Sequence, residues 1–217
     1  MRALLYATIA VVTLTFIAGA APLSEPELKN LLAAIRQNRT TQADFQEERV
    51  IRLMKKPVVS SGTVWFQPPN KFRREVKGNS PSVTVSDGRE LWIYYPNFKS
   101  AERYPLGKGS PLDATVAAIN SALNLKNIET SFNVIATKTE NGYDLQLLPR
   151  TAAMKRVFQK LDLRVNNQFR VARTDMLLPK SDRIGTTYSN QTRSPIPSSI
   201  FEFKPPPGTE VTTPLGQ

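Results

Sequence analysis

The sequence predicts a mainly β protein, an antiparallel meander of roughly nine to eleven strands with two helices. After Pro57, short runs of apolar residues alternate with polar ones at the two-residue period of strands. Hairpin turn pairs separate the runs: Asp87-Gly88 and Asn141-Gly142 are strong signals, and Asn166-Asn167 is a weaker one. Two stretches, 25–38 and 110–123, show helical spacing instead. Strands joined by such short links pair antiparallel.

The first helix is predicted to end at about Asn38. Ser24 and Glu27 have the spacing of a capping box around Pro26, which suits a first helical turn. Four apolar residues then follow at helical spacing: Leu28, Leu31, Leu32 and Ile35.

The predicted strands are apolar on both faces. Trp92 and Tyr94 alternate with a second apolar set in the same strand, so both faces of the sheet need cover. Curvature of the sheet around a hollow would supply part of it, and apolar, lidded hollows of this kind hold lipids. A last short strand is predicted over residues 200–203. The alternating sets are Val64/Phe66, Phe72/Val76, Val83/Val85, Leu91/Ile93/Tyr95, Leu145/Leu147 and Leu161/Leu163/Val165.

A second helix interrupts the meander. Ser110 is a helix cap followed by Pro111 at the first helical position. An isolated helix in a meander must cover something, either as a fixed cap on the open end of a curved sheet or as a movable lid. Its apolar stripe consists of Leu112, Val116, Ile119 and Leu123.

The N-terminus has the pattern of a secretory signal peptide. Arg2 precedes an uncharged apolar run over residues 3–18, and small residues follow at 18–20. The run is shorter than the roughly 20 residues that span a bilayer. We therefore expect cleavage of residues 1–20, an exported protein, and a single domain over residues 21–217.

The chain is strongly basic. Its 29 Lys and Arg outnumber its 18 Asp and Glu, for a formal charge of +11. Such a surface binds polyanions or merely keeps the protein soluble. For an exported protein, anionic lipid headgroups and lipopolysaccharide are more suitable polyanions than nucleic acid. The clusters are Arg49/Arg52/Lys55/Lys56, Lys71/Arg73/Arg74/Lys77 and Lys155/Arg156/Lys160.

The residue inventory offers little catalytic chemistry. The chain has no Cys and no His, which excludes zinc sites built on those residues, Ser-His-Asp triads and Cys-His pairs. Gly107-Lys108 lacks the glycine spacing of a phosphate-binding loop. The carboxylates lie mostly beside cations, as Glu75 does beside Arg74. We expect no enzyme, no cofactor and no metal.

Three motifs, in order and spacing, resemble a known family. They are GTVWFQPPNKF at 62–72, VSDGRELWIYYP at 85–96 and FEFKPPPGTEV at 201–211. With the signal peptide, an early helix and a Phe-x-Gln-like element at 45–47, this order resembles the LolA family of periplasmic carriers of outer-membrane lipoproteins. The resemblance spans nearly the whole mature chain.

The resemblance implies a fold and a function. The fold is an antiparallel, unclosed β-barrel of about eleven strands, with helices forming a lid over an apolar cavity. The function is a monomeric periplasmic carrier that shelters lipoprotein acyl chains between an inner-membrane lipoprotein-releasing transporter and a receptor at the outer membrane. The alternative is a lipid- or lipoprotein-sensing module, or a carrier of another lipid, with the same fold.

The chain departs from the family pattern at three positions. Pro68 stands where the family has the Arg that ties lid to barrel, and Glu47 replaces the amide of Phe-x-Gln. Arg74 replaces an aromatic residue that is common in the family. We expect Arg74 to take over the role of the arginine that Pro68 replaces.

The predicted site follows from the strand pattern and the resemblance together. Burying one sixteen-carbon acyl chain contributes on the order of 12 kcal/mol of favourable free energy, at roughly 0.8 kcal/mol per methylene. An enclosed hollow buries more of the chain than a surface groove does, so it suits the chain better. Arg73 and Arg74 are expected at the rim, and the stripe at 112–123 forms the lid. The expected acyl-binding residues are Val64, Phe66, Phe72, Val83, Val85, Leu91, Ile93 and Tyr95.

Overall fold

The computed structural model describes residues 21–106 and 128–214. The expected signal peptide and the lid residues Leu112, Val116, Ile119 and Leu123 lie outside the described residues. The helical elements are α1 (Glu25–Gln37), η1 (Pro96–Phe98), α3 (Ile128–Ser131), α4 (Ala152–Val157) and η2 (Ser198–Phe201). The strands are β1 (Gln42–Val50), β2 (Val58–Gln67), β3 (Lys71–Lys77), β4 (Ser82–Ser86), β5 (Glu90–Tyr95), β6 (Ser100–Pro105), β7 (Phe132–Thr139), β8 (Gly142–Pro149), β9 (Lys160–Asn166), β10 (Val171–Leu177), β11 (Arg183–Thr192) and β12 (Glu210–Thr212).

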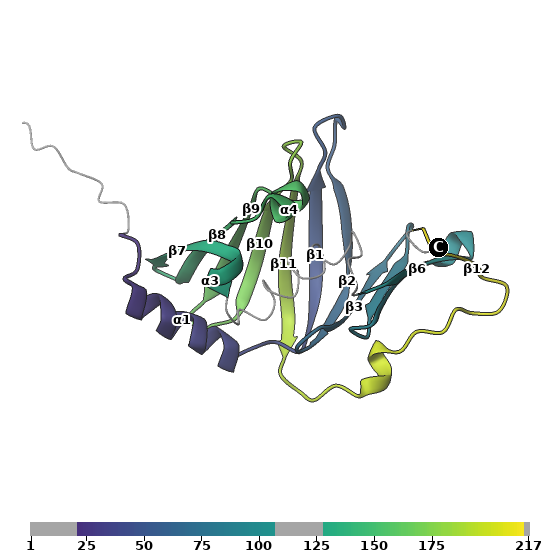
Figure 1. Ribbon diagram of the computed structural model, residues 1–217, viewed down its shortest axis with the longest axis horizontal. Coiled ribbons are helices and arrows are strands. Elements are labelled where there is room, and N and C mark those ends of the chain that lie inside the picture. Colours follow the sequence, from purple (N-terminus) through teal and green to yellow (C-terminus); the bar gives the residue numbers. More distant parts are fainter. Residues whose placement is uncertain (1–20, 107–127, 215–217) are drawn as a thin grey trace, which may run out of the picture.

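The described strands form one open sheet in the order β12-β6-β5-β4-β3-β2-β1-β11-β10-β9-β8-β7 (Figure 1). Two meanders, β1 to β6 and β7 to β11, meet where β1 pairs antiparallel with β11. The mainly β, unclosed fold is confirmed. The described sheet has twelve strands rather than about eleven, and the three-residue β12 pairs with β6 in parallel.

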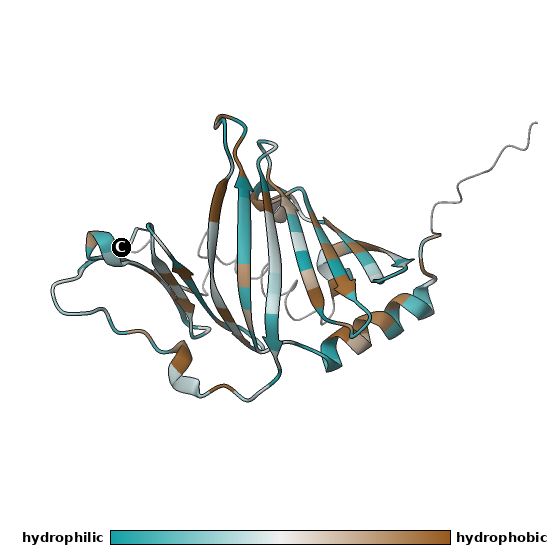
Figure 2. Cartoon of the chain, turned by 180° about the vertical axis from the view of Figure 1, so that it is seen from behind, coloured by the Kyte–Doolittle hydropathy of each residue, from teal (hydrophilic) through white to brown (hydrophobic). Residues whose placement is uncertain are grey.

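One face of the sheet carries the main core, and we call it the inner face. Helix α1 packs on it over β7 to β10, burying Leu31, Leu32 and Ile35 against Leu145 and Leu163. The predicted capping box is present, since the Glu27 carboxylate accepts hydrogen bonds from the backbone N–H of Ser24 at 2.8 Å and from its hydroxyl at 2.5 Å. Figure 2 shows the alternation of apolar and polar residues along the strands. None of the described helices is long and apolar enough to cross a bilayer.

The C-terminal segment covers part of the opposite, outer face. Phe201 is 1% exposed, and the ring of Phe203 lies 5.5 Å and 5.6 Å from the rings of Trp92 and Tyr94. Arg73 also holds the segment, donating a hydrogen bond from a terminal guanidinium nitrogen to the Ile200 carbonyl at 3.1 Å. The chain's own tail thus covers the part of the second apolar face formed by Trp92 and Tyr94.

The prediction of a strand over residues 200–203 is wrong. Residues 198–201 form the 3₁₀ turn η2, and no ladder follows until β12. Prolines at 195, 197 and 205–207 supply no backbone N–H, so this stretch is poorly suited to a ladder. Its aromatic residues attach it to the sheet through side chains instead.

Candidate functional site

An apolar cavity of about 220 Å³ lies between the C-terminal end of α1 and the inner face of the sheet. It lies at the junction of the two meanders, because strands β1 and β2 form one wall and β9 to β11 form the other. Its apolar lining includes Ile35, Ala43, Phe66, Leu161, Met176 and Tyr188.

Three arginines, Arg36, Arg39 and Arg170, also line this cavity. Burial, and secondarily the positive charge of Arg36, lower the pKa of Arg39. Arg170 donates a hydrogen bond to the Gln191 carbonyl at 3.1 Å. The pocket therefore combines an apolar interior with cationic groups, which suits an amphiphile better than a purely apolar molecule.

Six of the eight predicted acyl-binding residues share the inner face. Residues that pair across an antiparallel ladder point to the same face. Val64 pairs with Ala43, Phe66 pairs with Phe72, and Ile93 pairs with Thr84, which in turn pairs with Arg74. Val64 and Leu91 are buried, and the rest are half-buried. The six are Val64, Phe66, Phe72, Leu91, Ile93 and Tyr95, and of these Phe66 lines the cavity.

Val83 and Val85 lie on the outer face. They pair with Tyr94 and Trp92, the two residues on which Phe203 packs. Val85 is 1% exposed. These two residues are part of the packing on the outer face of the sheet and do not share a cavity with Phe72, so the sequence interpretation that grouped them is corrected.

The two expected rim cations lie on opposite faces of β3. Arg73 is on the outer face, where its guanidinium contacts Glu75 at 2.6 Å and the C-terminal segment. Arg74 is on the inner face, where a terminal guanidinium nitrogen lies 2.9 Å from Glu47 Oε2. The structure therefore does not bring them together at one rim.

Arg74, Glu47 and Phe45 form a compact cluster on the inner face. The Arg74 guanidinium lies 4.3 Å from the centroid of the Phe45 ring, and Phe45 is 3% exposed. The side chains of Arg74 and Glu47 are 28% and 16% exposed. Glu47 and Arg74, two of the three departures from the family pattern, are therefore partners, and the pair ties β1 to β3 across β2.

The second wall of the cavity was missed in the site prediction. The sequence predicts Leu161 and Leu163 as strand residues, but their strand is distant in sequence from the aromatic motif. Met176 and Tyr188 come from β10 and β11, whose inner-face neighbours Thr174 and Thr186 are polar, so these strands lack a clear alternation of apolar and polar residues. Within the described sheet the two walls are joined by the pairing of β1 with β11, and no local pattern encodes that pairing.

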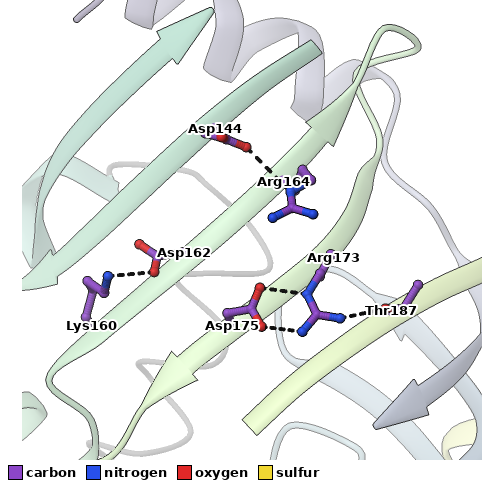
Figure 3. A network of polar contacts seen from close by, with 7 residues as sticks. All are labelled: Asp144, Lys160, Asp162, Arg164, Arg173, Asp175 and Thr187. Carbon is purple, nitrogen blue, oxygen red and sulfur yellow. Dashed lines mark hydrogen bonds and ion pairs between the residues drawn. The ribbon is translucent and has the colours of Figure 1, made fainter. Parts of the chain in front are cut away.

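The outer face of β8 to β11 is polar. Arg173 contacts both carboxylate oxygens of Asp175 and donates to the Thr187 hydroxyl at 3.1 Å (Figure 3). Lys160 pairs with Asp162 at 2.8 Å on the same face. Among the described residues no group of three or more carboxylates could hold a metal ion. This face is a solvated surface, and the apolar cavity is on the other side.

A half-buried tyrosine at the far end of the inner face predicts a pH response. Burial, followed by the 2.7 Å hydrogen bond from the Tyr104 hydroxyl to Glu102, raises the pKa of Tyr104 from 10.0 to about 12. The raised pKa favours the neutral phenol in the folded state. Its contribution to stability is therefore complete below pH 10.0 and is lost as the pH rises to about 12. Urea unfolding of Tyr104→Phe should show a shallower alkaline loss of stability than the wild type; equal slopes would contradict this.

Comparison with known proteins supports the resemblance. Residues 36–204 match the family model for the outer membrane lipoprotein carrier protein LolA. An outer-membrane lipoprotein carrier protein of Dechloromonas aromatica is 28% identical over 188 residues, covering 82% of this chain and 83% of the relative. One from Coxiella burnetii (strain CbuK_Q154) is 24% identical over 180 residues, covering 80% of each chain.

The fold also matches a solved structure. The crystal structure of an uncharacterized conserved protein from Thermus thermophilus matches with a TM-score of 0.53 at 15% identity, covering 86% of this chain and 99% of that one. The named relatives are carriers, which confirms the prediction of a non-enzymatic protein. With a family match that extends from the last turn of α1 into the C-terminal segment, the chain belongs to the LolA family of outer membrane lipoprotein carrier proteins.

Proposed function

We propose that this protein is a periplasmic carrier that shelters the acyl chains of lipoproteins on its inner face while they travel from the inner to the outer membrane. A lipoprotein-releasing transporter would load it, and an outer-membrane receptor would accept the cargo. The observation that carries the proposal is the apolar cavity at the junction of the two meanders, in a chain of the LolA family.

The apolar surface for cargo extends beyond the cavity. Its 220 Å³ is smaller than the range of about 300–1,000 Å³ that is usual for small-molecule pockets, so it holds only part of a long chain. Phe66 lines the cavity and faces Phe72 across the ladder, and Ile93 and Tyr95 extend the same face, all of them half-buried. An apolar strip therefore leads from the cavity over β2 and β3, and apolar residues recur on β5 beyond the polar inner-face residues Thr84 and Ser86 of β4.

Phe72→Glu is expected to weaken cargo binding roughly ten- to hundredfold, because it removes one aromatic contact and places a charge on the apolar strip. Phe66→Glu should do the same at the cavity wall. The measurement is equilibrium binding of a fluorescent triacylated lipopeptide, with circular dichroism to verify that each variant is folded.

The matched control is Val59→Glu. Val59 is 61% exposed on β2 and faces outward, since its partner Glu48 points away from Glu47. This variant introduces the same charge into the same strand and should bind like the wild type. Wild-type affinity in folded Phe66→Glu and Phe72→Glu variants would overturn the proposed site.

A further inference from the structure

One end of the sheet gathers three cationic segments that are far apart in the sequence. Val50 at the end of β1 pairs with Arg183, Arg183 pairs with Leu177, and Leu177 pairs with Lys160. These pairings bring the β1–β2 loop, the β10–β11 turn and the α4 region to the same end of the sheet, the upper end in Figure 1. We call segments 49–58, 151–160 and 177–183 the cationic rim.

The cationic rim is almost free of negative charge. The three segments contain four, three and two cations in turn, and Asp182 is their one carboxylate. Asp182 accepts a hydrogen bond from the backbone N–H of Arg52 at 2.9 Å. Arg49 and Lys160 have ion-pair partners in Glu47 and Asp162. The other cations form no ion pair with any described residue: Arg52, Lys55, Lys56, Lys155, Arg156, Lys180 and Arg183.

Apolar side chains project from the same rim. Leu53 is 91% exposed and Met54 is 51% exposed at the tip of the β1–β2 loop, which is closed by a hydrogen bond from the Met54 N–H to the Ile51 carbonyl at 2.9 Å. Val58, at the start of β2, is 44% exposed, and Val59, directly after the rim segment, is 61% exposed. Solubility accounts for the cations but not for these side chains, whose exposure is unfavourable in water.

We propose that the cationic rim docks the protein on an anionic phospholipid surface, with Leu53 and Met54 entering the headgroup layer. Lysines and arginines spread over three segments match a surface of many phosphates, and each adds attraction as it nears that surface. The apolar residues form a protruding tip, which suits insertion into a fluid interface. An acidic protein partner would use the charges and leave this tip without a role.

The experiment is flotation of the full-length mature protein with phosphatidylcholine vesicles, with and without about one-third phosphatidylglycerol. Binding should need the anionic lipid and fall with added salt. Lys55→Gln/Lys56→Gln should weaken partitioning by roughly fivefold for each charge removed. Leu53→Ser/Met54→Ser should weaken it by roughly tenfold, through lost apolar burial.

Lys138→Gln/Lys204→Gln is the matched control. Both lysines are exposed, one near the β7–β8 turn and one in the C-terminal segment, and neither belongs to the rim. This variant should float like the wild type. Equal weakening by the control would overturn the proposal. Unchanged flotation of Leu53→Ser/Met54→Ser would also overturn it, because the rim would then act through charge alone, as it would with an acidic protein partner. Lipopeptide binding without vesicles should be unchanged in the rim variants, which separates this proposal from cargo binding.

Discussion

Gly62→Ala is expected to destabilise the protein severely. A Cβ at Gly62 would lie 1.8 Å from the backbone carbonyl oxygen of Glu75 and 2.8 Å from the Phe45 ring. The ring contact could be relieved by a side-chain shift, but the carbonyl belongs to the neighbouring strand β3. Relief therefore requires β2 and β3 to separate. The cost should reach or exceed the upper end of the range of about 1–3 kcal/mol for overpacked cores.

The measurement is urea unfolding followed by circular dichroism. Ser61→Ala is the matched control, since it places the same residue one position earlier at an exposed site and should stay within about 0.5 kcal/mol of the wild type. Gly62→Ala should lose a large part of a total stability of about 5–15 kcal/mol. A variant as stable as Ser61→Ala would show that β2 and β3 tolerate the extra methyl group.

The sequence predicts the hairpins and the alternation within each strand, but it does not show which residues of neighbouring strands share a face. Phe66 and Phe72 are ladder partners with five residues between them, so positions of like parity share a face. Four residues lie between the partners Ser86 and Leu91, which reverses the parity. Val83 and Val85 therefore face away from Leu91 and Ile93, although all four have odd numbers.

Long-range pairing is the other part that the sequence does not encode locally. Both the cavity and the cationic rim depend on the pairing of β1 with β11, which joins residues more than a hundred positions apart. In the sequence the clusters around Lys55 and Lys155 are separate basic runs, and the strand order of the described sheet places them at the same end. The cluster around Arg73 and Arg74, by contrast, is divided between two faces because neighbours in a strand point in opposite directions.

Arg74→Leu is expected to destabilise the protein by about 2–3 kcal/mol. It leaves the Glu47 carboxylate, 16% exposed, with only the more distant and more exposed Arg49 guanidinium at 3.8 Å, and it removes the cation from the face of Phe45. A fully buried pair would lose about 3–5 kcal/mol, and the residual exposure of both side chains reduces that figure. The corresponding change on the outer face, Arg173→Leu beside Asp175, should cost only about 0–1 kcal/mol, since that pair is more exposed.

The double variant Glu47→Leu/Arg74→Leu separates the ion pair from packing. Replacing both partners with apolar residues removes the stranded charge, so its stability should return to within about 1 kcal/mol of the wild type. Urea unfolding of the two single variants and the double variant gives the coupling energy as a thermodynamic cycle. The inner face would also become more apolar next to Phe45, so lipopeptide binding should be retained or strengthened. Additive losses in the double variant would mean that Glu47 and Arg74 stabilise the sheet independently, and the pair would not be the tie between β1 and β3.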